Sequence, residues 1–157
     1  MGKNNFFFIV FFLMVLAPPF GYAVQPEKIG TAWVYSSESD YESAKTFLID
    51  AIKGRGLVIN NIGNAEAMLG RTAGAVGVNI SVYKHADVVL FCKADLAHNL
   101  VVMSPHNIVL CPYSIAVYET QEKPGTVYYS YSVPQLNLPT EKLIRRLLHD
   151  IVLEAMD

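Results

Sequence analysis

The chain has 157 residues, of which 52% are hydrophobic and 17% are charged, and its formal net charge is −2. Acidic and basic residues are scattered along it, so it lacks the basic patch that binding to nucleic acid or to an anionic membrane surface requires. We therefore expect no nucleic-acid partner, and the length that follows an N-terminal signal is enough for one domain with a single core.

The N-terminal residues have the features of an export signal. A short region with Lys3 precedes an apolar block at 6–17, and small residues stand at Gly21 and Ala23. Since a bilayer span needs roughly 20 apolar residues, we interpret the segment as a signal peptide cleaved after Ala23; the alternative is an uncleaved anchor. We expect a periplasmic or secreted protein with no stable membrane anchor after cleavage. The predicted organisation is a signal peptide at 1–23, a linker at 24–30 and a single domain at 31–157.

Strand and helix patterns alternate in the first half of the mature chain. A strand is predicted at 31–36, and Ser39 and Glu42 behind it have the spacing of a capping box at the start of an amphipathic helix. A second strand is predicted at 57–62, after which Asn64 can cap another helix. The apolar face of that helix comprises Met68, Leu69, Thr72, Ala73 and Val76.

The second half predicts a central strand, a short helix, a hairpin and a long final helix. The strand at 81–91 precedes a helix that Pro105 ends, with Met103 on its core face. Strands at 108–118 and 126–133 are joined by a turn around Pro124-Gly125, which makes them a hairpin. The last helix has a wide apolar stripe that should cover the sheet. It consists of Leu143, Ile144, Leu147, Leu148, Ile151, Val152 and Ala155.

The two cysteines, Cys92 and Cys111, lie close to this hairpin. In an exported protein, two cysteines on neighbouring strands favour a disulfide, which for a loop of about twenty residues stabilises the fold by about 3 kcal/mol. Two buried free thiols are one alternative. The other is a transition-metal or haem site, because borderline and soft ligands gather in this stretch. Its candidate ligands are Cys92, His98, Met103, His106 and Cys111.

Pro112 interrupts the apolar strand pattern directly after Cys111. Because proline has no N–H to donate to a ladder, we predict a bulge or an unpaired position there, and such irregularities often adjoin binding sites. The candidate ligand-binding residues are therefore His98, His106, Pro112 and Tyr113. Surface or backbone-bonding roles remain open for the two histidines, and ordinary packing in a tyrosine-rich sheet remains open for Tyr113.

Catalytic templates are absent from the sequence. It has no Gly-x-Ser-x-Gly, no His-Glu-x-x-His, no phosphate-binding glycine loop and no dinucleotide fingerprint. These observations favour an exported, non-enzymatic ligand-binding or accessory domain without a cofactor, whose partner is an unidentified small molecule or protein. The alternative is a metal- or haem-binding protein, or a thiol redox protein, that uses the five candidate ligands.

The order of the elements resembles an uncharacterised family, domain of unknown function number 302. The features that carry the resemblance are the helix and glycine at 41–56, the segments 57–64, 88–93 and 95–103, Cys111-Pro112-Tyr113 leading to 117–119, and the strand at 125–131. The chain is most similar to an exported branch with Phe91-Cys92 and Cys111-Pro112-Tyr113 in place of Asn-Pro and Leu-Pro pairs. The resemblance implies a single α+β domain, with a curved, mostly antiparallel β-sheet and helices packed on one face in a β-α-β4-α-like order. The residue pattern alone leaves the strand direction across 94–106 open, so the antiparallel expectation comes from the family.

Overall fold

The structure, a computed structural model, describes residues 24–136 and 139–157, so the predicted signal peptide lies outside the described residues. Within these ranges one open, six-stranded antiparallel sheet is combined with four α-helices, in the strand order β1-β2-β6-β5-β4-β3. This confirms the expected α+β fold. The elements are β1 (Glu27–Ile29), β2 (Ala32–Glu38), α1 (Tyr41–Gly54), β3 (Val58–Asn64), α2 (Ala65–Ala73), the 3₁₀ helix η1 (Gly74–Val76), β4 (Tyr83–Cys92), α3 (Ala94–Met103), the 3₁₀ helix η2 (Pro105–Leu110), β5 (Tyr113–Thr120), β6 (Thr126–Ser132) and α4 (Pro139–Met156).

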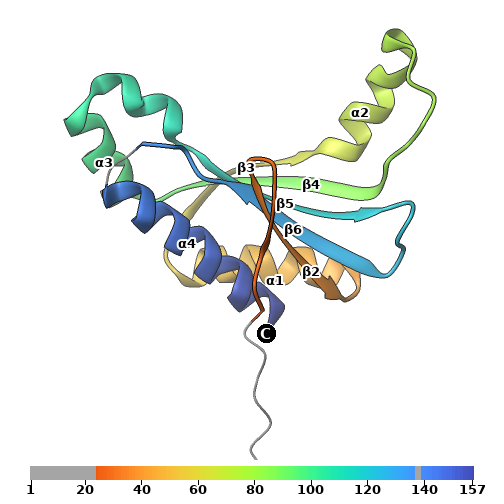
Figure 1. The fold of residues 1–157 in the computed structure, drawn as a ribbon, viewed down its shortest axis with the longest axis horizontal. Helices are drawn as coiled ribbons and strands as arrows, with labels where there is room; N and C mark the ends of the chain where they lie inside the picture. Colours follow the sequence, from red (N-terminus) through yellow and green to blue (C-terminus); the bar gives the residue numbers. More distant parts are fainter. Residues whose placement is uncertain (1–23, 137–138) are drawn as a thin grey trace, which may run out of the picture.

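Helices α1 and α4 cover one face of the sheet, below the strands in Figure 1. On β5 and β6 every second residue is buried, as expected when one face of a strand meets a helical layer. Tyr129 at the centre of β6 is 1% exposed, and its hydroxyl lies 3.3 Å from the carbonyl of Ala44 and 3.4 Å from that of Ala155. One side chain of the sheet thus contacts both covering helices.

The N-terminus of α1 differs from the prediction. Asp40, and not Ser39, caps the helix, because its Oδ2 accepts a hydrogen bond from the Ser43 N–H at 2.9 Å. The capping box predicted from Ser39 and Glu42 is therefore wrong by one residue. The second predicted cap is confirmed, since Asn64 Oδ1 accepts from the Ala67 N–H at 2.7 Å.

Two carboxylates are buried beneath the helical layer, at the end of the sheet where the turn of the β5–β6 hairpin lies. Asp87 on β4 accepts a 2.7 Å hydrogen bond from the Tyr41 hydroxyl, and Lys45 Nζ lies 2.6 Å from the same oxygen. Glu119 on β5 accepts from the Gly125 N–H at 2.7 Å in the turn of the β5–β6 hairpin. Asp87 therefore attaches α1 to the sheet, whereas Glu119 holds the turn.

The predicted strand at 108–118 is wrong in its first part. Residues Pro105–Leu110 form η2, and β5 begins only at Tyr113. Ser104 caps η2 through its hydroxyl and Pro105 stands in its first turn, where proline needs no N–H partner. Ile108 and Val109 are 62% and 81% exposed, so this apolar run is not buried in the sheet. Met103, predicted to be in the core, is also exposed.

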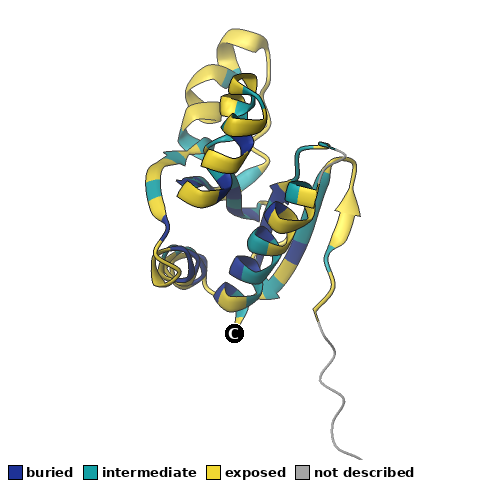
Figure 2. Cartoon of the chain, turned by 90° about the vertical axis from the view of Figure 1, so that its left-hand side faces the viewer, coloured by how far each residue is buried: buried dark blue, intermediate teal, exposed yellow. Residues whose placement is uncertain are grey.

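Helix α2 and η1 project from the side of the sheet opposite α1 and α4 (Figures 1 and 2). The apolar face predicted for α2 has no buried residue, and the helix ends at Ala73 before the single 3₁₀ turn of η1. The segment interpreted as a linker contains β1, an exposed edge strand. No helix in the described ranges is both long enough and apolar enough to cross a membrane.

Candidate binding cleft between strands β5 and β6

The sheet is split at one end between its two central strands. Strands β5 and β6 pair from Glu119↔Val127 to Ala116↔Ser130. The outer ladders continue further, because β2 pairs with β6 up to Ser132 and β4 pairs with β5 down to Tyr113. Beyond Ala116 each central strand therefore follows its outer neighbour, and the two strands diverge.

The divergence opens a cleft of about 620 Å³. Its walls come from four parts of the chain: the β1–β2 turn, the residues that lead into β5, the end of β6 with the segment after it, and the first turns of α4. Its described lining residues are Lys28, Gly30, Thr31, Trp33, Leu110, Pro112, Tyr113, Ser114, Ser132, Val133, Pro134, Gln135, Glu141 and Arg145. Apolar side chains, hydroxyl groups and the edges of two strands thus surround one space.

The cleft has an excess of positive charge. Lys28 and Arg145 line it, and within the described ranges neither forms a salt bridge with a carboxylate. The single acidic lining residue, Glu141, accepts a hydrogen bond from the Leu136 N–H at 3.0 Å. The Lys28 ammonium instead lies 5.6 Å from the ring centroid of Trp33, a cation–π arrangement.

Arg145 also acts on Tyr131, next to the cleft. Burial raises the pKa of Tyr131, the hydrogen bond with Tyr35 raises it further, and the Arg145 charge opposes both. The two hydroxyl groups are 3.1 Å apart, and the Tyr35 hydroxyl lies 2.6 Å from His149 Nδ1. The guanidinium of Arg145 is therefore close enough to the end of β6 to affect the hydroxyl of Tyr131.

The Tyr113 hydroxyl is buried and has no hydrogen-bond partner, and among the described residues it is the one buried polar side-chain atom of this kind. The residue is 4% exposed, and burial raises the pKa of its hydroxyl, as does the charge of Asp95 to a smaller extent. The hydroxyl stays protonated at neutral pH and is a donor without an acceptor. Such a group costs about 1–3 kcal/mol in a folded protein unless a water molecule or a ligand accepts its hydrogen bond.

The predicted disulfide lies directly behind one wall of the cleft, next to residues that line it. Cys92, at the end of β4, is bonded to Cys111, and their Cα atoms are 6.2 Å apart, within the usual range. Cys111 stands between Leu110 and Pro112, which both line the cleft. The peptide bond between Cys111 and Pro112 is cis. The disulfide thus ties this wall directly to the central sheet.

The structure brings together two of the four predicted ligand-binding residues. Pro112 and Tyr113 line the cleft. Pro112 stands just before β5, outside its ladder with β4. Of the two predicted possibilities, a bulge or an unpaired position, the structure has the unpaired position. His98 on α3 and His106 on η2 are exposed and line neither pocket of the described residues. The register irregularities of the sheet occur in β3 and β4 instead.

The five candidate metal ligands do not form a cluster in the described ranges. No group of three or more His, Cys, Asp or Glu side chains there is placed to hold a metal ion, and both cysteines are in the disulfide. The metal or haem alternative therefore stays a prediction, which elemental analysis and an absorbance scan of the purified protein would test.

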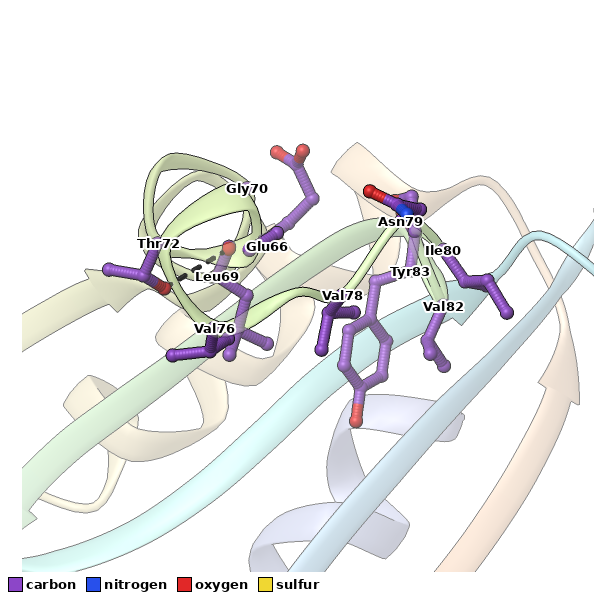
Figure 3. A pocket seen from close by; sticks show the side chains of 12 residues that line it. Glu66, Leu69, Gly70, Thr72, Val76, Val78, Asn79, Ile80, Val82 and Tyr83 are labelled. Carbon is purple, nitrogen blue, oxygen red and sulfur yellow. Dashed lines mark hydrogen bonds between the residues drawn. The ribbon is translucent and has the colours of Figure 1, made fainter.

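A second pocket, of about 390 Å³, lies between α2, η1 and the segment 78–83. Figure 3 shows Leu69, Val76 and Val78 on the same side of this projection as the Tyr83 ring. The lining is mostly apolar, and Glu66 is the one charged residue among the described residues that form it. This pocket has few of the polar groups that orient a ligand.

Residues that the sequence analysis did not identify supply most of the polar chemistry of the cleft. These residues are spread over about 117 positions of the chain and belong to five different elements, β1, β2, β5, β6 and α4. They are Lys28, Trp33, Ser114, Ser132 and Arg145. Arg145 lies outside the apolar stripe of its helix, which indicates exposure but no particular neighbour. No local pattern in the sequence signals their proximity.

Comparisons with known proteins agree with this fold. No curated protein matches the chain. A crystal structure of an uncharacterized conserved protein DUF302 from Bacillus stearothermophilus matches with a TM-score of 0.66 and 13% identity, over 81% of this chain and 99% of that one. The family model described as Domain of unknown function DUF302 matches residues 33–154. The chain therefore belongs to the DUF302 family.

Proposed function

We propose that this protein is an exported, non-enzymatic domain that binds a small molecule in the cleft between β5 and β6. The observation that carries the proposal is the early end of the β5–β6 ladder at Ala116↔Ser130, while both outer ladders continue. A volume of about 620 Å³ is within the range of roughly 300–1,000 Å³ that is typical of small-molecule sites.

The walls of the cleft are held in place by the fold, which favours binding. The β2–β6 ladder holds one wall, while the β4–β5 ladder and the disulfide hold the other. A site on rigid elements loses little conformational entropy when a ligand enters. The cleft therefore needs little rearrangement before it can accept a ligand.

The lining groups suit recognition better than catalysis. They provide hydroxyl groups at Ser114 and Ser132, strand edges with main-chain donors and acceptors, and the Trp33 ring. Among the described lining residues there is no histidine or cysteine, the side chains that most often serve as general base or activated nucleophile near neutral pH. Binding needs only the groups that are present.

Export is supported by the disulfide together with the N-terminal sequence. Disulfides persist in oxidising compartments and are rare in the cytosol of mesophiles. The described part of the chain has no free cysteine, which agrees with folding after export. Fractionation of cells that express the full-length protein, with mass analysis of the N-terminus, tests both export and cleavage after Ala23.

Ligand binding can be tested by NMR with a fragment library. We expect ligands to shift the amide signals of Gly30, Ser114 and Ser132 more than those of Gly74 and Gly77, which lie on the α2–η1 projection.

A blocking variant makes the assignment specific. Ser114→Phe should fill the cleft and abolish the shifts, whereas Ser36→Phe, an exposed position on β2 outside the lining, should leave them unchanged. If no fragment shifts the cleft signals more than those of the projection, the proposed function is wrong.

A further inference from the structure

The unpaired positive charge of the cleft indicates the class of its ligand. We propose that the ligand is an organic acid, whose carboxylate is bound by Arg145 and Lys28 while its planar or apolar body lies against Trp33. This inference rests on the binding function proposed above and specifies what the cleft selects.

The charge balance of the lining residues favours an anion. Lys28 and Arg145 contribute two positive charges, and the carboxylate of Glu141 contributes one negative charge and is already engaged by the Leu136 N–H. Neither cation has a salt bridge in the described ranges. A cationic ligand would be repelled, and a neutral ligand would leave both cations without an anionic partner.

The type of each cation favours a carboxylate on a larger molecule. The planar guanidinium of Arg145 can donate two parallel hydrogen bonds to a carboxylate, and the Lys28 ammonium adds a mobile point charge. Next to these charges the lining includes Trp33, Leu110, Val133 and Pro134. A small inorganic anion would satisfy the cations but leave these apolar surfaces in water, so an acid with an apolar or aromatic body fits the whole cleft better.

Arg146 provides a matched comparison on the same helix. Its side chain is 82% exposed, it does not line the cleft, and its Nε lies 3.8 Å from the Asp150 carboxylate. Replacing Arg145 or Arg146 by methionine removes the same charge and keeps an unbranched side chain. Because both positions are exposed on α4, both variants should fold.

The single tryptophan of the chain makes the test direct, since Trp33 itself lines the cleft. The probes are benzoate, its neutral analogue benzamide and the cationic benzylamine, each titrated into the folded protein at low salt while the Trp33 fluorescence is followed. We expect saturable binding of benzoate that is about tenfold or more tighter than that of benzamide, because a charge-assisted hydrogen bond contributes more than a neutral one. Benzylamine should bind most weakly.

The variants and the ionic strength decide the role of the charges. Arg145→Met should lower the affinity for benzoate to that for benzamide, Lys28→Met should lower it several-fold, and Arg146→Met should leave it unchanged. Added sodium chloride should weaken the binding of benzoate and not of benzamide.

Two results would overturn the inference: equal affinities for benzoate and benzamide in the native protein, or a benzoate affinity that Arg145→Met and salt leave unchanged. In both cases binding in the cleft would survive. If none of the three probes changes the fluorescence, the inference fails as well, and the proposed function is rejected only if no fragment of the library shifts the amide signals of Ser114 and Ser132.

Discussion

Removing the Cys92–Cys111 disulfide should destabilise the protein strongly. In the double variant Cys92→Ser/Cys111→Ser the loop that contains α3 and η2 is no longer closed in the unfolded chain. The folded state should persist, because Leu96 and Leu100 anchor α3 in the core without the bond. The unfolded ensemble gains conformations, and the equilibrium shifts toward it.

The magnitude follows from the size of the loop. The two cysteines are 19 positions apart, and the chain-entropy model assigns about 3 kcal/mol to a loop of this length. The total stability of a small domain is about 5–15 kcal/mol, so the variant should lose a large fraction of it. The loop contributes Leu110 to the cleft, so the loss of closure should also weaken ligand binding.

Urea unfolding, followed by Trp33 fluorescence and circular dichroism, measures the effect. The midpoint of the double serine variant should lie below that of the oxidised native protein, by about 3 kcal/mol divided by the m-value. Native protein treated with dithiothreitol is the matched control and should unfold together with the variant. The reductant should leave the variant itself unchanged.

Two results would refute this reasoning. If the variant and the oxidised native protein differ by less than about 1 kcal/mol, the loop does not restrict the unfolded chain as the model requires. If the mass of protein recovered from an oxidising compartment shows two free thiols, the bond is not present in the mature protein.

Three further changes test the polar groups of the core. Asp87→Ala leaves the Tyr41 hydroxyl and the Lys45 ammonium without their acceptor. We therefore expect the free energy of unfolding, measured in urea, to fall by about 3–5 kcal/mol. The hydrogen bond from the Gly125 N–H and, secondly, that from Lys84 lower the pKa of the Glu119 carboxyl group below its ordinary value of 4.5. The ionised carboxylate therefore stabilises the fold at pH values above 4.5, and this contribution is lost as the pH falls through the lowered pKa. Glu119→Gln should therefore flatten the decline of stability with acid, measured by thermal unfolding at several pH values. Tyr113→Phe removes a buried hydroxyl without a partner, and should leave the stability of the ligand-free protein unchanged or raise it by about 1 kcal/mol.

Each of these changes has a control or a contrary outcome. Asp50→Ala, at an exposed position on α1, should alter stability by less than about 0.5 kcal/mol, and a similar small loss for Asp87→Ala would contradict the role given to that carboxylate. An acid decline that Glu119→Gln leaves unchanged would show that other carboxylates cause it. A loss above about 1 kcal/mol for Tyr113→Phe would show that the hydroxyl has a partner in the folded protein.

Elements with a long apolar repeat were predicted well. Most of the stripe of α4 is confirmed by the burial of Ile144, Leu148, Ile151 and Val152, because an 18-residue helix over a sheet has one face that must be apolar. The prediction is wrong for Leu143, which lies at the margin of this face and is 54% exposed. The cap at Asn64 is confirmed because it depends on residues only three positions apart. The strand predicted from 108 failed because an apolar run of a few residues is compatible with a strand or a helical turn, and the Ser104 cap with Pro105 selected the turn.

From periodicity and caps, the residue pattern predicted the order of the elements and the helix that covers the sheet. It favoured a disulfide over two free thiols or a metal site, whereas the antiparallel α+β layout was an expectation that came from the resemblance to the family. The residue pattern also pointed to Pro112 and Tyr113 at the edge of the cleft. Only the tertiary structure decided that β5 and β6 separate beyond Ala116 and that Lys28, Trp33 and Arg145 meet there. The physical reason is that ladder ends and long-range proximity depend on how the strands pack against their outer neighbours, and no local pattern of residues encodes that packing.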